Sequence, residues 1–76
     1  MSISRDDKKW LKQLGNNLRR HRVQQGLTQQ RLAERAEIDI RNVQRIEAGE
    51  INVLLSTFNR IRKVLDCPWE EVVPGD

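Results

Sequence analysis

The sequence is poor in the residues that build disulfide-linked, metal-bound or membrane-spanning structure. Its 76 residues include one cysteine, Cys67, and one histidine, His21. A single cysteine excludes an internal disulfide and a Cys-x-x-Cys metal site, and one Cys with one His offers neither a metal centre nor a catalytic pair. No apolar run approaches the roughly 18 residues of a membrane span, and the opening MSISRDDKKW lacks the apolar stretch of a signal peptide. We therefore expect a cytoplasmic protein that is not an enzyme, with no cofactor and no membrane partner.

Signals for strands and linkers are also scarce. The chain has four glycines, two prolines, one phenylalanine and no tyrosine, and it contains no useful alternating run of apolar residues. The length, and the lack of any segment that looks like a linker or a repeat, predict a single domain over residues 1–76, near the small end of what folds unaided. No segment suggests a sensor for a small-molecule ligand.

Positive charge is concentrated in the first part of the chain. The net charge is only +3, but residues 1–46 carry 11 Lys or Arg against 5 Asp or Glu, whereas residues 47–76 carry 3 against 6. A basic front and an acidic rear favour a polyanionic partner on one side of the protein. Charge alone is equally compatible with a mixed, solvated surface.

Apolar residues recur at helical spacing along the chain. Trp10, Leu11, Leu14 and Leu18 follow the three- and four-residue intervals of an amphipathic helix, and Gly26 lies where such a helix ends. The pattern predicts helices at about 6–25, 28–36 and 39–48, a fourth that ends at about 66, and a short fifth that begins at Pro68. We expect the N-caps to be Thr28 and Asp39, the third helix to end at Gly49, and the inward-facing residues of the fifth helix to be Trp69, Val72 and Val73.

The second and third of these helices are joined by a turn too short for antiparallel stacking, which is typical of a helix-turn-helix unit. The outer face of the third helix carries Arg41, Asn42, Gln44 and Arg45. Arginine can donate two hydrogen bonds to guanine O6 and N7, and amides can pair with adenine N6 and N7. This face therefore suits base reading in a major groove, although an ordinary polar helix face would look the same.

The stretch LTQQRLAERAEIDIRNVQRIEAGEIN resembles the helix-turn-helix of the Cro and phage-repressor family, often called Xre-like. The matching residues are Leu27-Thr28-Gln29, Leu32-Ala33, Ile38, Val43, Ile46-Glu47 and Gly49. The likeness extends from about Leu14 to Asp76, with the motif at about 29–48 and residues 1–13 as an N-terminal extension of the first helix. It implies an all-α, five-helix phage-repressor-like domain that binds double-stranded DNA as a bacterial transcriptional regulator such as a repressor. It also implies a homodimer with the recognition helix 40–48 in the major groove.

The resemblance further implies roles for individual residues. In this family an arginine near the end of the first helix pairs with an acid near the end of the third, and these positions are Arg22 and Glu47 here. Such a pair would explain a charge on an otherwise apolar helix face. The base-reading positions are Arg41, Asn42, Gln44 and Arg45. The positions that contact phosphate or position the DNA are Thr28 and Gln29, with Asn52 as a weaker phosphate candidate. We also expect the Gln29 side chain to brace a residue at the start of the recognition helix.

Four positions depart from the family pattern. Arg31 stands where relatives place an acid that completes a capping box, and our hypothesis is that it contacts a phosphate. Ile40 stands where relatives place a polar base reader, and we favour packing at the edge of the core over contact with a thymine methyl. Leu54 stands where a Ser or Thr usually caps the fourth helix, so the sequence does not define the residue at which that helix begins. Arg62 replaces a small residue, which leaves the packing of that helix open.

Two further features leave alternatives open. Lys8, Lys9 and Lys12 form a basic cluster that suits a phosphate or a membrane surface, although a solvated helix face is the simpler interpretation. The acidic, partly apolar end of the chain, with Trp69, Val72 and Val73, suits instead a protein-interaction module such as an antitoxin that binds a toxin. Salt dependence separates this alternative from DNA binding, because added salt weakens phosphate contacts by orders of magnitude and hardly affects an apolar interface.

Overall fold

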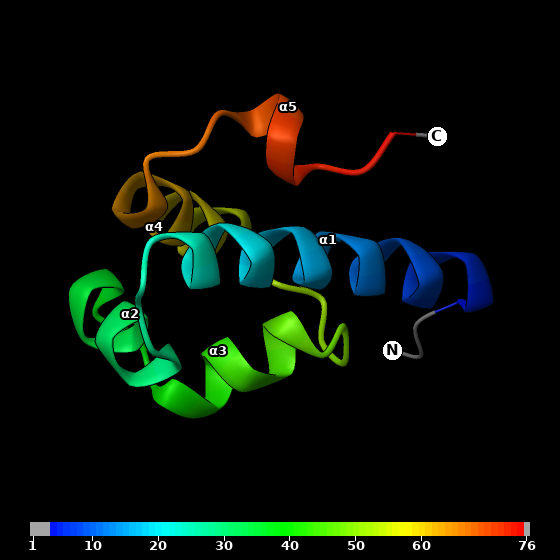
Figure 1. Cartoon of the computed structure of the whole chain (residues 1–76). Coiled ribbons are helices and arrows are strands. Elements are labelled where there is room, and N and C mark those ends of the chain that lie inside the picture. The colour runs from blue at the N-terminus through cyan, green and yellow to red at the C-terminus, as the bar shows by residue number, and fades with distance from the viewer. Residues whose placement is uncertain (1–3, 76) are drawn as a thin grey trace.

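Five helices account for most of the chain. The computed structural model describes residues 4–75, so residues 1–3 of the predicted extension and Asp76 lie outside the described residues. Figure 1 shows α1 (Arg5–Gln24), α2 (Gln29–Ala36), α3 (Ile40–Glu47), α4 (Leu55–Leu65) and α5 (Trp69–Val72). The prediction of an all-α fold is confirmed, and the helix ends differ from the predicted ends by about one residue. None of these helices has the length and apolarity needed to cross a membrane.

Side-chain caps explain where two of the central helices begin. The Thr28 hydroxyl oxygen accepts a hydrogen bond from the Arg31 N–H at 3.0 Å, and an Asp39 carboxylate oxygen accepts one from the Arg41 N–H at 2.8 Å. Each bond satisfies a donor that the first helical turn leaves unpaired and typically contributes about 1 kcal/mol. Leu54 precedes α4 without a side-chain hydrogen bond, so this helix begins without that contribution.

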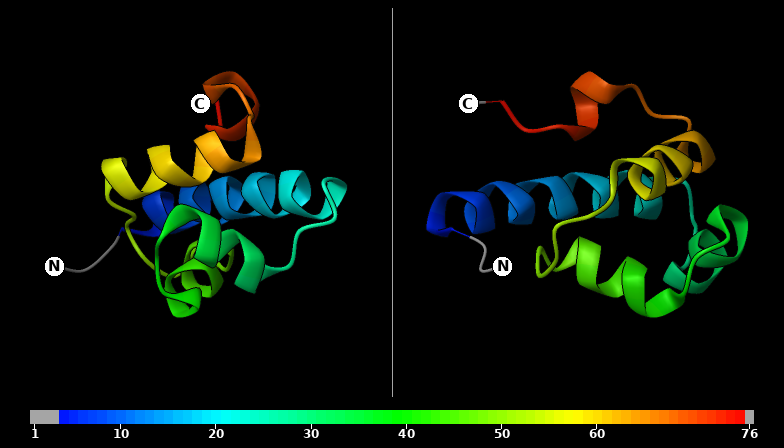
Figure 2. Two further views of the ribbon diagram at one scale, coloured as in Figure 1. Left: turned by 90° about the vertical axis from the view of Figure 1, so that its left-hand side faces the viewer. Right: turned by 180° about the vertical axis from the view of Figure 1, so that it is seen from behind.

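Helix α1 runs through the middle of the molecule. Figures 1 and 2 show α2 and α3 on one side of it and α4 and α5 on the other, and α2 also packs against α4. The buried apolar side chains are Leu11, Leu14, Leu18, Leu32, Ala33, Ala36, Val43, Ile46, Phe58, Ile61, Leu65, Cys67 and Val72. Removal of this apolar area from water is the main stabilising term for the fold.

The predicted inward orientation of the fifth helix is correct for Val72 and wrong for Trp69. Val72 is fully buried and Val73 is half-buried, whereas Trp69 remains 39% exposed. The Trp69 ring packs on Phe58, with the ring centroids 5.0 Å apart, and the Arg62 guanidinium lies 5.0 Å from the Trp69 centroid. Because α5 is a single turn of four residues, only part of its surface meets the core.

Arg62 is accommodated because its polar groups find partners at the turn between α4 and α5. Its Nη1 donates to the Cys67 carbonyl at 3.3 Å, and its Nε and Nη2 donate to Asn59 Oδ1 at 3.3 and 3.1 Å. The side chain therefore lies across the turn and leaves the core to smaller residues. The neighbouring Cys67 thiol is buried, and this burial raises the pKa of the thiol above its ordinary value, so the unreactive protonated form is favoured.

Candidate DNA-binding surface

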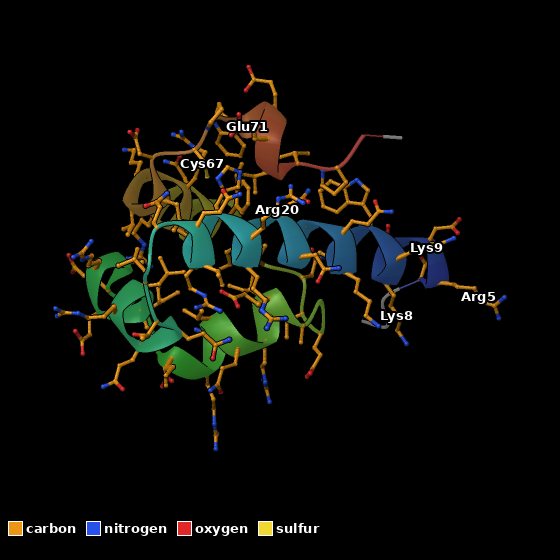
Figure 3. All side chains as sticks on the ribbon, viewed as in Figure 1. Arg5, Lys8, Lys9, Arg20, Cys67 and Glu71 are labelled. Atoms are coloured by element: carbon orange, nitrogen blue, oxygen red, sulfur yellow. The ribbon has the colours of Figure 1, made fainter. Side chains whose placement is uncertain are left out.

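The outer face of α3 presents the side chains expected to read bases. Val43 and Ile46 point into the core and hold the inner face of the helix. The residues on the opposite, exposed face are Arg41, Asn42, Gln44 and Arg45. Figure 3 shows side chains projecting from α3 on the side away from α1. A helix displayed in this way has the size and the hydrogen-bonding groups that a major groove accepts.

A buried ion pair holds α3 against α1. Arg22 Nε donates to Glu47 Oε2 at 2.7 Å, and Arg22 Nη2 donates to Glu47 Oε1 at 3.0 Å. Both residues are almost fully buried, with 8% and 7% of their surface exposed. Two parallel bonds of this kind are the geometry in which a guanidinium and a carboxylate interact most strongly. The pair explains why the packing face of α3 contains a charge.

The same carboxylate also connects α3 to α2. Gln29 Nε2 donates to Glu47 Oε1 at 3.1 Å, and Arg22 Nη1 donates to the Leu27 carbonyl at 2.8 Å. Among residues 4–75, no buried side-chain nitrogen or oxygen lacks a hydrogen-bond partner. The prediction that Gln29 braces the start of the recognition helix is wrong, because its amide reaches the last residue of α3. The orientation of α3 is therefore set jointly by α1 and α2.

Close approach of two backbones sets the separation of α1 and α3. A Cβ atom at Gly15 would lie 2.4 Å from the Ile46 carbonyl oxygen and 2.5 Å from that of Glu47. A Cβ atom at Gly49 would lie 2.6 Å from Lys12 Cα, and Gly49 also has a φ of 71°, which favours glycine. Residues without a side chain at these two positions thus allow α3 to lie directly on α1.

An open hollow of about 480 Å³ lies beside the start of α2 and the end of α3. The residues that line it are Arg19, Arg22, Thr28, Gln29, Gln44, Glu47 and Ala48. Sequence reasoning missed Arg19, although its position three residues before Arg22 places both on the same side of a helix. The unpaired N–H groups at the start of α2 and the exposed Arg19 guanidinium make this hollow suitable for an anion such as a phosphate.

The other residues predicted to position DNA lie outside this hollow. Arg31 is exposed in the first turn of α2, with its Nη1 3.8 Å from Glu34 Oε2. Asn52 is exposed in the loop before α4, where it borders an apolar hollow together with Trp10. Ile40 is 37% exposed at the start of α3, so it lies at the boundary between the core and the outer face.

His21 and Cys67 have separate structural partners. His21 Nε2 lies 3.4 Å from Glu71 Oε2, between α1 and α5, whereas the Cys67 thiol lies 3.9 Å from the Arg62 carbonyl oxygen. Across residues 4–75, no three His, Cys, Asp or Glu side chains are grouped so that they could hold a metal ion. His21 thus contacts α5, and Cys67 lies in the turn before that helix.

The fold and the displayed third helix define a helix-turn-helix DNA-binding protein. A family model for the helix-turn-helix matches residues 18–72, and the chain belongs to this family. It is similar in structure to the restriction-modification controller protein C.AhdI from Aeromonas hydrophila, with a TM-score of 0.78 and 32% sequence identity, covering 82% of this chain and 94% of that one. Comparison with curated proteins produced no match. The protein is a DNA-binding transcriptional regulator of the Xre-like type.

Proposed function

We propose that this regulator reads a specific DNA sequence by placing α3 in the major groove. The observation that carries the proposal is the exposed polar face of α3 with a buried ion pair directly behind it. The proposed base-reading residues are Arg41, Asn42, Gln44 and Arg45. The Arg22–Glu47 pair fixes the angle at which α3 is presented, because a locked supporting contact keeps a binding element in register.

A second group of residues positions the protein on the DNA backbone. The start of α2 directs its N–H groups, the Thr28 hydroxyl and the backbone of Gln29 toward a phosphate in the hollow beside Arg19. Arg31 exchanges its exposed, weak contact with an acid of the same helix for a phosphate. Asn52 adds a contact from the loop before α4. These contacts set the register of α3 in the groove and carry no sequence information themselves.

The similarity to a restriction-modification controller protein supports a finer proposal for the biological role. This chain acts as a bacterial controller of transcription in a system of that kind. Such a regulator works in the cytoplasm, and its output depends on its own concentration and assembly. The role requires binding alone, so we infer that the protein is not an enzyme and needs neither a cofactor nor a small-molecule effector.

Selection of bound duplexes from a random pool tests base reading by α3. The wild-type protein is expected to enrich a palindromic motif, because a symmetric dimer presents two recognition helices about 34 Å apart. Arg45→Ala is expected to weaken binding of that motif about 5- to 150-fold, for a loss of about 1–3 kcal/mol, and to relax selection at one position per half-site. Fluorescence anisotropy titrations measure the affinities.

Arg60→Ala is the matched control for this experiment. It removes an equal charge from an exposed position of α4, on the other side of α1 from α3, and is expected to bind like the wild type. An Arg45→Ala protein with unchanged affinity and an unchanged motif would contradict base reading by this residue. Failure of the wild-type protein to bind any duplex at low ionic strength would contradict the proposed function as a whole.

An apolar surface beside the start of α4 supports a symmetric homodimer. Leu54 and Leu55 are 72% and 71% exposed, and Trp10 and Trp69 nearby retain 36% and 39% exposure. Trp10, Leu55 and Trp69 border a mostly apolar hollow of about 270 Å³. Contiguous exposed apolar surface of this kind marks an interaction site, and a second copy of the chain would bury it.

Leu55→Asp is expected to convert the dimer to a monomer, because the interface would then bury an unpaired carboxylate. Analytical ultracentrifugation over a range of concentrations measures the change. Val23→Asp makes the same kind of substitution at an exposed apolar position near the C-terminal end of α1, away from this hollow, and should leave the dimer intact. If the Leu55→Asp protein still sediments as a dimer, the dimer interface does not include the apolar surface at Leu55. A wild-type protein that stays monomeric at every concentration would favour the alternative of a protein-interaction module with a different partner.

A further inference from the structure

We propose that one edge of α1 is a second contact surface for the phosphates of duplex DNA. This basic edge consists of Arg5, Lys8 and Lys12, and it continues along α1 from Arg19, which lines the hollow beside the start of α2. It contacts the strand that passes the C-terminal end of α3, outside the helix-turn-helix motif itself. The inference rests on the DNA-binding function proposed above and adds a binding surface to it.

Helical geometry places the basic edge on the flank of α1 that meets α3. Intervals of four or three residues connect Lys8, Lys12, Gly15, Arg19 and Arg22, so these residues form one row along the helix. Two members of the row touch α3 directly, since Gly15 lies against its backbone and Arg22 binds its last residue. The remaining members, Lys8, Lys12 and Arg19, are basic and lie on this same flank of α1.

The first turns of α1 extend past the end of α3. Gly49, just after α3, lies against Lys12, because a Cβ atom at Gly49 would be 2.6 Å from Lys12 Cα. Residues 5–11 continue beyond this contact by about 10 Å at 1.5 Å per residue. Figures 1 and 2 show this blue end of α1 projecting past α3. In Figure 3, Lys8 is directed to the side of α1 on which α3 lies, and Arg5 points outward from the end of the helix.

The loop after α3 offers no cation to the DNA strand beside it. Residues 48–54 read AGEINVL, with one acid, Glu50, and no Lys or Arg. When α3 occupies the major groove, a phosphate strand borders the groove on each side. On the side of this loop, Glu50 alone would repel the phosphates. The basic edge lies next to the loop and supplies the positive charge that the loop lacks.

The charges of the basic edge are available for an anion. Its three side chains are exposed, and within residues 4–75 none of them has an acidic partner within 4.0 Å. Asp6 and Asp7 fall on other sides of α1, because successive residues are rotated by about 100°. A face that is merely solvated usually mixes both signs of charge, whereas this edge carries one sign only. We therefore favour a phosphate-binding surface over a simple solvated face.

The double variant Lys8→Gln with Lys12→Gln tests the basic edge. Each lost phosphate contact reduces the magnitude of the slope of log affinity against log salt by about 0.9, so two lost contacts should reduce it by about 1.8. If the two proteins bind equally near 1 M salt, the variant should bind about 60-fold more weakly at about 0.1 M salt. The loss should be equal for the selected motif and for random duplexes, because phosphate contacts carry no sequence information. Anisotropy titrations between about 50 and 200 mM salt measure the slope, and ethylation interference identifies the phosphates whose contacts are lost.

Controls separate the basic edge from net charge and from misfolding. The double variant Arg60→Gln with Lys63→Gln removes the same charge from exposed positions of α4 and should keep the wild-type slope. Thermal unfolding followed by circular dichroism should give the wild-type midpoint for both double variants, because the substituted side chains are all exposed. If the Lys8→Gln, Lys12→Gln variant keeps the wild-type slope, the phosphate contact by the basic edge is refuted. If Arg45→Ala still loses the motif in that case, the proposed function stands. An equal loss in both double variants also refutes the contact by the basic edge, and a wild-type protein that binds no duplex overturns both proposals.

Discussion

Replacement of Glu47 by alanine is expected to lower the free energy of unfolding by about 3–5 kcal/mol, a large share of the stability of so small a domain. The substitution leaves Arg22 buried without its bidentate partner and removes the acceptor of Gln29 Nε2. An unpaired buried guanidinium costs much more than the intact pair contributes. Urea unfolding followed by circular dichroism measures the difference between the variant and the wild type.

A paired substitution separates stability from helix orientation. Arg22→Met combined with Glu47→Leu replaces both charges by apolar side chains and is expected to recover most of the stability that Glu47→Ala loses, with a smaller loss left because Gln29 Nε2 and the Leu27 carbonyl also lose their partners. Because the ion pair sets the angle of α3, this folded double variant should still bind the selected DNA motif more weakly than the wild type. A Glu47→Ala protein that unfolds at the wild-type urea concentration would contradict the buried geometry.

Gly15→Ala is expected to destabilise the protein by about 1–3 kcal/mol or more and to weaken DNA binding. The new Cβ would lie 2.4 Å from the Ile46 carbonyl oxygen and 2.5 Å from that of Glu47. These are backbone atoms, so α1 and α3 have to separate to relieve the contact. Helix propensity alone would make the same change stabilising by about 1 kcal/mol. The sign of the measured change in unfolding free energy therefore distinguishes the two effects.

Gln13→Ala provides the comparison for this substitution. Gln13 is exposed two positions earlier in α1, so alanine there meets no neighbouring backbone, and we expect a change below about 0.5 kcal/mol. Both variants are compared by urea unfolding and by anisotropy titration with the selected motif. A Gly15→Ala protein that proves more stable than the wild type would refute the close approach of α1 and α3.

The helices were predictable because their signals are local. Apolar spacing and the caps at Thr28 and Asp39 depend on residues within about one turn of each other, and the helix ends agree with the prediction to about one residue. The Arg22–Glu47 contact was predictable only through the family resemblance. No local rule connects two side chains that are 25 positions apart in the sequence.

The surroundings of other side chains were not predictable in this way. Trp10 and Trp69 follow the apolar periodicity, yet they border an open hollow because the short α5 covers only part of the core. Gln29 reaches Glu47 at the end of α3, because the start of α2 lies beside that end. Arg19 carried no sequence signal apart from its spacing, and it lines the hollow proposed for a phosphate.

The amino-acid order by itself determined five helical segments, the caps at Thr28 and Asp39, and the polar face of residues 41–45. Only the tertiary structure decided that Gly15 brings α1 onto α3, that Gln29 and Arg22 share one carboxylate, and that Lys12 lies beside Gly49. Helix formation depends on hydrogen bonds and side chains about four positions apart, so the chain specifies it locally. The mutual placement of helices depends on how surfaces distant in the chain fit together, which no short stretch of residues contains.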